Sequence, residues 1–303
     1  MNKRVAIELE EGWEIIQMGI TKLINILEGD PNESPMDVDY HMKLYTMVFS
    51  MCNQRTPRDY SNQLYERYEG VYNNYLQSKV LPAVQKKHDD DDVSMLQELV
   101  RRWENHKVLV TKLRKCFYYL DLSYVPRNRL PTLRDVGFSC FREIVGEEMK
   151  VRVKDAVILL INQERRGEEI DRTLLKNVVQ IFVDFGNKYD DARCGTQNRE
   201  AWYDEYLRSP AGSVRCNRPA ITPSLGLEYY VNDFETAFLN NTADYYTRKA
   251  SNWTKEDYTS KAEECLKKEK NRVSHYLHSS TEEKLLKRVQ DVLNAAAADQ
   301  TIA

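Results

Sequence analysis

The sequence lacks any run of apolar residues long enough to span a bilayer or to act as a signal peptide; its first twelve residues already mix lysine, arginine and glutamate. The sequence also lacks a large excess of either charge, because 44 basic and 47 acidic side chains give a formal net charge of -3. No local basic patch stands out. We therefore expect a protein of the cytoplasm and nucleus with no membrane and no nucleic-acid partner.

Catalytic and metal-binding motifs are also missing. The sequence has no glycine-rich dinucleotide motif, no P-loop and no nucleophile elbow, and its six cysteines form no CxxC pair. Four cysteines fall within apolar helical stripes, so we expect reduced, buried thiols. His275 and His278 share a helical face with Glu264 and Cys265, but the paired ligands on short loops that are typical of structural zinc are absent. We expect no catalytic residue, no metal and no cofactor; an enzyme would require a metal at His275 and His278.

Glycine and proline are scarce, at 11 and 9 residues, while 42% of the residues are hydrophobic and 30% are charged. This composition is typical of a soluble helical protein. Apolar residues recur at helical spacing in five runs before a break at Pro126. The runs are residues 9–27, 40–54, 60–88, 95–106 and 107–124.

Beyond the break, Thr132 with Asp135 predicts a helix start, and Asp171 predicts another. Residues 188–226 then hold three prolines and three glycines without a sustained period, which indicates an irregular insert. Helical periodicity returns after the insert, and Ser280 with Glu283 predicts the start of a last helix.

Two of the predicted helices carry more apolar residues than one buried face needs. On residues 40–54 one stripe consists of Leu44, Met47, Val48 and Met51. A second stripe consists of His41, Met42, Tyr45 and Phe49. The second stripe is either a further part of the core or a partner-binding patch, because methionine and aromatic residues are enriched at the centres of interfaces. Residues 107–124 repeat the pattern, with a core stripe of Leu109, Leu113, Cys116 and Leu120 beside Phe117, Tyr118 and Tyr119.

Several segments, in order and spacing, resemble the N-terminal region of cullins, nearest to the plant members that serve SCF-type ubiquitin ligases. The segments are LEEGWEIIQMGITKL (9–23), KLYTMVFSMCN (43–53), RWENHK (102–107), FYYLD (117–121), LLKNV (174–178), YYTRKA (245–250) and AEECLKKEKNRVSHYLHS (262–279). The resemblance covers about residues 5–187 and 228–292, and the last segment is long enough to be specific.

The resemblance implies an all-α fold, an elongated array of cullin repeats that are each a five-helix bundle. Residues 1–130 would form the first, adaptor-binding repeat and residues 131–278 the second, interrupted by the insert; residues 279–303 would begin a third and fray. The implied function is that of a non-catalytic ubiquitin-ligase scaffold that binds a Skp-type adaptor carrying an F-box protein. The implied adaptor contacts are His41, Met42, Tyr45, Phe49, Tyr118 and Tyr119.

The chain departs from the family pattern at Leu122, where the family usually has arginine after an acidic or amide residue; this change would weaken a contact at the rim. We interpret the chain as truncated before the half that recruits a RING-box protein, so no RING-box partner and no complete ligase are expected. Val289, Val292 and Leu293 would then lack packing partners, leaving a mobile or self-associating tail. Two alternatives stay open: a helical tethering protein in which Tyr45 and Phe49 are core residues, or an aberrant cullin-like product without a function.

Overall fold

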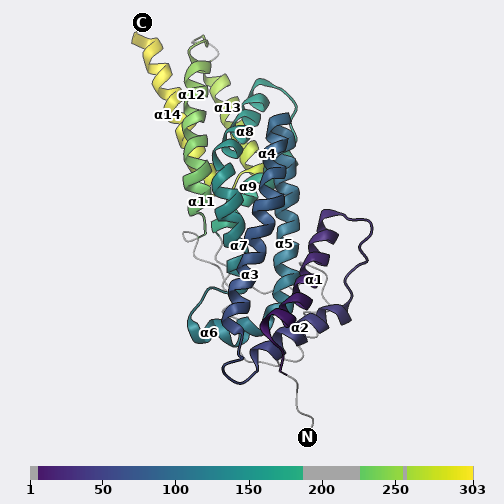
Figure 1. The fold of residues 1–303 in the computed structure, drawn as a ribbon. Helices are drawn as coiled ribbons and strands as arrows, with labels where there is room; N and C mark the ends of the chain where they lie inside the picture. The colour runs from purple at the N-terminus through teal and green to yellow at the C-terminus, as the bar shows by residue number, and fades with distance from the viewer. Residues whose placement is uncertain (1–5, 187–225, 255–257, 303) are drawn as a thin grey trace. The chain divides into compact units, whose positions relative to one another are not determined.

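The computed structural model describes residues 6–186, 226–254 and 258–302, and in these ranges every regular element is helical (Figure 1). The predicted all-α class is therefore confirmed. The insert predicted at 188–226 lies, except for Gly226, outside the described residues. The first elements are α1 (Leu9–Glu28), α2 (Val38–Cys52), α3 (Ser61–Tyr75), the π-helical turn η1 (Leu76–Val80), α4 (Leu81–Asp90), α5 (Asp92–Leu122) and α6 (Tyr124–Asn128). They are followed by α7 (Leu133–Phe141), η2 (Arg142–Gly146), α8 (Glu147–Arg166), α9 (Arg172–Gly186), α11 (Glu228–Tyr230), η3 (Val231–Glu235), α12 (Thr236–Ala250), α13 (Tyr258–Tyr276) and α14 (Thr281–Ile302).

These helices form two compact units. Of the described residues, the first unit contains 6–83 and 101–147, and the second unit contains 84–100, 148–186, 226–254 and 258–302. The repeat boundaries predicted at residues 130 and 278 were based on sequence resemblance, whereas the two units are defined by their compactness. The division into units therefore does not test these boundaries, and they stay predictions.

The fourth and fifth predicted helices are in fact one helix. The expected break between residues 106 and 107 is absent, and α5 continues from Asp92 to Leu122. No glycine or proline occurs in this stretch, so nothing forces the backbone to leave the helical conformation. Only Asp91 separates α4 from α5, and its carboxylate accepts a hydrogen bond from the backbone nitrogen of Ser94 at 2.8 Å, which starts α5.

In the first unit, α1 and α2 approach each other closely at two glycines. A Cβ atom at Gly12 would collide with Met51, and one at Gly19 would collide with Leu44. The same face of α1 buries Ile16 in the core. This packing fixes one side of α2 and leaves its opposite side free to present other residues.

His106 on α5 is fully buried in the first unit among aromatic rings, including those of Trp103 and Phe141. Its Nε2 lies 2.8 Å from the carbonyl oxygen of Gly137, while its Nδ1 has no hydrogen-bond partner among the described residues. A carbonyl only accepts, so Nε2 carries the proton. Burial lowers the pKa of His106 to about 4, because a proton on Nδ1 would place a charge among the rings.

We expect the free energy of unfolding to fall as the pH drops from about 6.5 towards 4. In this window the unfolded chain binds a proton at His106 and the folded chain does not, so protonation favours unfolding. The loss from this residue should reach roughly 2 kcal/mol at pH 5. Urea titrations at pH 7 and pH 5 measure it. The variant His106→Gln, whose amide can still donate to Gly137, should lose this share of the pH dependence; equal pH dependence in variant and parent would contradict the account.

The second unit is built around stacked aromatic residues. The ring of Phe234 lies 5.6 Å from both Phe182 and Phe238, with interplanar angles of 27° and 11°. The predicted start at Asp171 is confirmed, because its carboxylate accepts a hydrogen bond from the backbone nitrogen of Leu174 at 2.9 Å. In the first unit the cap at Thr132 is confirmed too, with the Asp135 nitrogen 3.2 Å from its hydroxyl.

The C-terminal helix α14 corrects one prediction. Val289 and Leu293 are buried, and Val292 is half-buried, because α14 packs within the second unit against α12 and α13. The hydroxyl of Tyr258 also donates a hydrogen bond to the carbonyl of Leu293 at 2.5 Å. The expectation that these residues lack packing partners was therefore wrong: it assumed that only a following repeat could cover α14, whereas helices that precede it in the chain do so.

Candidate functional site

The surplus apolar stripe of α2 lies in the first unit beside the C-terminal part of α5. Leu44, Val48 and Met51 are buried, so the first stripe predicted for this helix is core, with Met47 half-buried at its edge. Because side chains at i and i+4 share a helical face, this packing turns Tyr45 and Phe49 together towards a different side. The stripe therefore becomes a surface feature positioned by a rigid helix.

Three rings from the two helices meet in what we call the aromatic triad, formed by Tyr45, Phe49 and Tyr119. The Tyr45 and Phe49 rings stack with centroids 6.2 Å apart, and the Phe49 and Tyr119 rings meet edge to face at 4.9 Å. Phe49 is 38% exposed, while Tyr45 and Tyr119 are half-buried. Such pairs are worth about 0.5–1.5 kcal/mol beyond area burial, so the rings are held in place before any partner arrives.

Asn53, which follows the last residue of α2, fixes the triad further and was not predicted as a site residue. Its side-chain oxygen accepts a hydrogen bond from the hydroxyl of Tyr119 at 2.8 Å, and its amide nitrogen donates to the backbone carbonyl of Phe49 at 2.8 Å. One amide thereby links the ring from α5 to the end of α2. An asparagine directly after a predicted helix was the available signal, but capping alone would have explained it.

The other predicted contacts occupy different depths. Met42 is half-buried on the same side of α2, whereas His41 and Tyr118 are 8% and 7% exposed. The Nδ1 atom of His41 lies 3.7 Å from the sulfur of Cys116. Of the six predicted residues, Met42 and the triad therefore offer surface, whereas His41 and Tyr118 are buried.

The site carries little charge at neutral pH. Burial, together with the positive charges of the nearby Lys112 and Lys115, lowers the pKa of His41 to about 4, so its imidazole is neutral. Burial likewise raises the pKa of Tyr45, with the neighbouring Tyr119 as a smaller cause, so its phenol stays protonated. A neutral, preformed aromatic surface is suited to binding an apolar partner surface and supplies no acid or base for catalysis.

Comparison with known proteins identifies the family of this chain. A family model described as the cullin alpha solenoid domain matches residues 13–303. The chain belongs to the cullin family. It is 47% identical over 305 residues to Cullin-1 of Oryza sativa subsp. japonica, and 43% identical over 298 residues to Cullin-2 of Arabidopsis thaliana. It is also 37% identical over 283 residues to Cullin-like protein 3 of Arabidopsis thaliana.

The matches cover different shares of the relatives. The cullin chain aligns over 99% of its own length with the rice protein but spans 36% of that protein; with the Arabidopsis Cullin-2 the shares are 97% and 35%. With Cullin-like protein 3 they are 92% and 93%. The predicted resemblance to plant cullins is thus confirmed, and the activity of the longer relatives is not transferred by it.

At the departure from the family pattern, Asp121 has a structural role. Its carboxylate lies 2.7 Å from Nε of Arg114 and accepts a hydrogen bond from the backbone nitrogen of Leu133 at 2.8 Å. The next residue, Leu122, is half-buried. The prediction that Leu122 weakens a contact at the rim stays a prediction.

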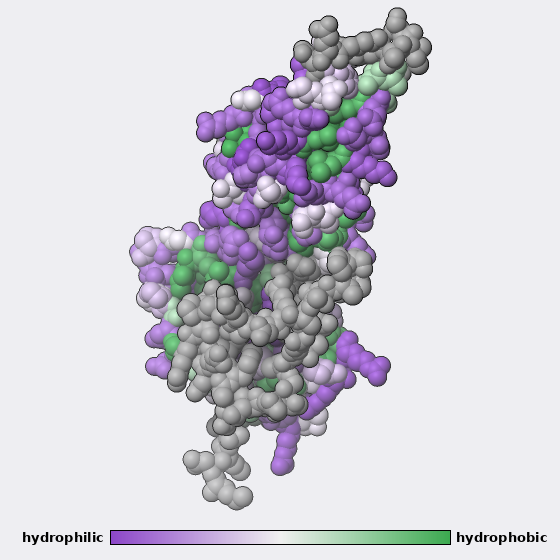
Figure 2. Space-filling view, turned by 180° about the vertical axis from the view of Figure 1, so that it is seen from behind, coloured by the Kyte–Doolittle hydropathy of each residue, from purple (hydrophilic) through white to green (hydrophobic). Residues whose placement is uncertain are grey.

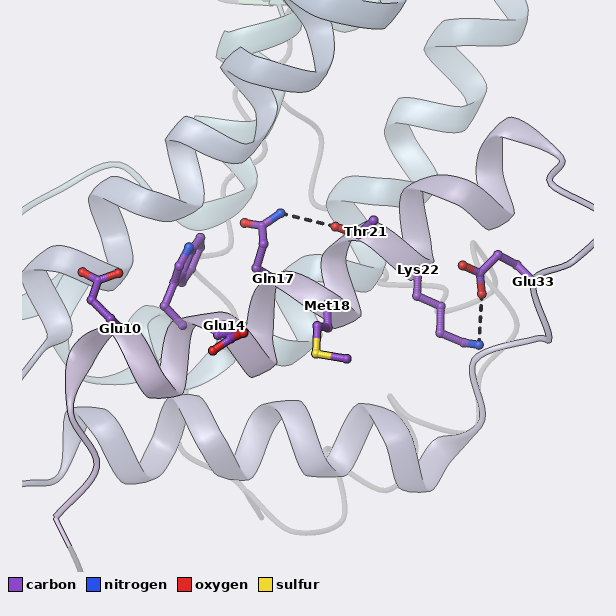
Figure 3. A pocket seen from close by; sticks show the side chains of 8 residues that line it. Glu10, Glu14, Gln17, Met18, Thr21, Lys22 and Glu33 are labelled. Atoms are coloured by element: carbon purple, nitrogen blue, oxygen red, sulfur yellow. Dashed lines mark hydrogen bonds and ion pairs between the residues drawn. The ribbon is translucent and has the colours of Figure 1, made fainter.

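A second candidate surface of the cullin chain is an open groove of about 600 Å³ along α1 (Figure 3). Met18 lies in it and is 64% exposed, while Lys22 at one end pairs with Glu33 at 3.2 Å. A hydrogen bond from Arg67 lowers the pKa of Glu10, so this carboxylate stays ionised and cannot serve as a general acid. Nothing in the groove resembles a catalytic pair.

The remaining chemical candidates lead to ordinary structural roles. Within the described residues no group of three or more histidine, cysteine or acidic side chains is placed to hold a metal ion. The Nδ1 atoms of His275 and His278 lie 2.7 and 2.8 Å from the Asn271 carbonyl and the Ser280 hydroxyl. The four described cysteines are free and buried, and burial raises the pKa of Cys116 to about 12. No helix in the described part of the chain is long and apolar enough to cross a membrane.

Proposed function

We propose that this cullin chain is a non-catalytic scaffold of an SCF-type ubiquitin ligase and that it binds a Skp-type adaptor carrying an F-box protein. The contact would be made by Met42 and by the aromatic triad on α2 and α5. The work of the scaffold is to hold the adaptor, and the chemistry of ubiquitin transfer would belong to other subunits.

The observation that carries the proposal is the preformed aromatic triad. Most large apolar side chains are buried, and the described surface is mainly hydrophilic on the face shown in Figure 2. The described large apolar side chains that remain exposed are Met18, Val38, Phe49, Val93, Val151 and Leu159. Phe49 is the aromatic member of this set and stands in a cluster fixed by Asn53. Rigid aromatic anchors of this kind dominate binding energy at protein interfaces.

The alternative of a tethering protein requires Tyr45 and Phe49 to be core residues. The exposure of Phe49 favours the surface role instead. Exposed residues of this kind contribute to the affinity for a partner and only modestly to the stability of the fold, and alanine replacement of Tyr45 and Phe49 tests this. We place the scaffold in the cytoplasm and nucleus, the compartments where a Skp-type adaptor and its F-box proteins would be met.

A calorimetric titration tests the proposal. A purified Skp-type adaptor with an F-box fragment is titrated into the cullin chain, and we expect saturable one-to-one binding with a dissociation constant in the micromolar range or tighter, on the order of -8 kcal/mol. A negative heat-capacity change should accompany it, because apolar surface is buried. A folded chain that takes up no adaptor would refute the proposed function.

A further inference from the structure

The segment between α5 and α7 contains the short helix α6; we call residues 123–131 the α6 loop, or simply the loop, and it is firmly held in the first unit. The hydroxyl of Tyr124 donates a hydrogen bond to Asn62 at 2.6 Å, and the hydroxyl of Tyr65 donates one to the carbonyl of Pro131 at 2.9 Å. Inside the loop, the nitrogen of Leu130 donates to the carbonyl of Val125, which is itself buried. Residues 123–131 therefore have a defined conformation.

Arg129 adopts a strained backbone conformation in this loop. Its φ and ψ are 54° and 40°, and it is the non-glycine residue with positive φ in the described part of the chain. A glycine would adopt this conformation without the steric cost that a Cβ atom brings. An arginine at such a position adds a steric cost that the fold does not need, which points to a use of its side chain outside the fold.

The side chains of Arg127 and Arg129 are exposed, and neither forms an ion pair with a described residue. Other arginines of the first unit do find partners: Arg58 pairs with Glu8 at 3.1 Å, and Arg114 pairs with Asp121 at 2.7 Å. The loop thus presents two guanidinium groups that the fold itself does not neutralise. A carboxylate is the partner that suits a guanidinium group best, because the two can form paired hydrogen bonds.

Hydrogen bonds tie the loop and the aromatic triad to the same stretch of the chain, residues 53–62. Tyr119 and Tyr124 are fastened to Asn53 and Asn62, which stand at the two ends of the connection between α2 and α3. Figure 1 shows α6 and α2 at the same end of the first unit. One partner covering a standard area of about 800 Å² per side can therefore span both features.

We propose that Arg127 and Arg129 form a cationic rim that contacts an acidic segment of the protein docked on the aromatic triad. The inference rests on the proposed function and adds the chemistry of the partner, namely aspartate or glutamate side chains beside an apolar patch. Exposed charges at a rim act mainly on association: they attract the partner over several ångströms and are screened by salt.

Association kinetics test the rim. The Skp-type adaptor with its F-box fragment is immobilised, and the parent is compared with Arg127→Glu, Arg129→Glu and the double variant at low and at physiological salt. We expect the association rate constant of the double variant to fall on the order of tenfold at low salt, with a smaller difference at high salt. The dissociation rate should change less.

Lys79→Glu is the matched control, because the side chain of Lys79 is also exposed. Lys79 lies in η1, just after the C-terminal end of α3, whereas Asn62 lies at the start of α3. This substitution should leave association nearly unchanged. If it slows association as much as the single arginine reversals do, the proposed role of the cationic rim is contradicted, while the proposal of adaptor binding is unaffected. If the folded parent does not bind the adaptor at all, the proposed function and the rim both fail.

A second variant separates charge from folding. Arg129→Gly removes the guanidinium group and relieves the backbone, so we expect its melting temperature to equal or exceed that of the parent while its association slows. A variant that melts at a higher temperature and associates as fast as the parent would show that Arg129 has no role in the contact.

Discussion

Replacing Tyr45 and Phe49 together with alanine is expected to lower the affinity for a Skp-type adaptor by a factor on the order of a thousand while the protein stays folded. Each ring at the centre of an interface contributes at least about 2 kcal/mol, which is roughly thirtyfold in the dissociation constant. The thousandfold figure multiplies the two single losses; because the rings contact each other at 6.2 Å, and Phe49 also contacts Tyr119 at 4.9 Å, the measured double loss should depart from that product by a coupling between the rings. Calorimetry measures the affinities.

Met18→Ala provides the control for this experiment. Met18 is the most exposed of the large apolar residues described and lies on α1 of the same unit, outside the triad. Its removal should leave the affinity unchanged. Circular dichroism should show that the double variant keeps its helices. A double variant that unfolds would instead place Tyr45 and Phe49 in the core, and would favour the tethering alternative.

Removing the carboxylate of Glu269 is expected to have the largest effect on stability. Glu269 on α13 is fully buried in the second unit and meets two guanidinium groups: Nε of Arg165 at 3.0 Å and Nη1 of Arg272 at 2.7 Å. The hydroxyl of Tyr246 donates to the same carboxylate at 2.7 Å. Burial alone would raise the pKa of Glu269, but the two arginines lower it below its ordinary value, so the group is charged.

Glu269→Ala should therefore cost about 3–5 kcal/mol, because it leaves a buried guanidinium group without its counter-ion. Arg272 retains a second partner in Glu164 at 2.8 Å, so Arg165 bears most of the loss. Urea unfolding followed by circular dichroism measures it. On the same helix, Glu264→Ala removes an exposed carboxylate that pairs with Lys268, and should cost far less than Glu269→Ala because water screens an exposed ion pair. Equal costs for the two variants would contradict the assigned role.

The positions of the triad residues on α2 could be predicted from spacing, because helical periodicity separates the stripe of Leu44 from that of Tyr45. The burial of each side chain could not be predicted. His41 and Tyr118 belong to surplus stripes as clearly as Phe49 does, yet both are buried. Whether a side chain faces a neighbouring helix or solvent depends on tertiary contacts between distant parts of the chain, such as the 3.7 Å approach of His41 Nδ1 to the sulfur of Cys116 on α5.

Other differences between the sequence-based predictions and the structure can also be traced to particular residues. The full extent of α5 was within reach of the sequence, because buried residues continue at helical spacing through Trp103, His106 and Leu109 and no glycine or proline interrupts the backbone. The packing of α14 was missed because the partners of Val289 come from helices that precede it, and sequence does not show that α12 lies against it. The positive φ of Arg129 could not be predicted, since an arginine gives no indication of a left-handed backbone conformation in the way that a glycine does.

Hydrogen exchange of the cullin chain, with and without a Skp-type adaptor bound to an F-box fragment, tests the central claim most directly. We expect amide hydrogens in α2 and in the C-terminal part of α5 to exchange more slowly on binding, including those around both Phe49 and Tyr119. Helix α8, which carries the exposed Val151 and Leu159, should be unaffected. Protection confined to α8 or to the groove along α1, with α2 exchanging as in the free chain, would contradict the claim that the aromatic triad is the docking site.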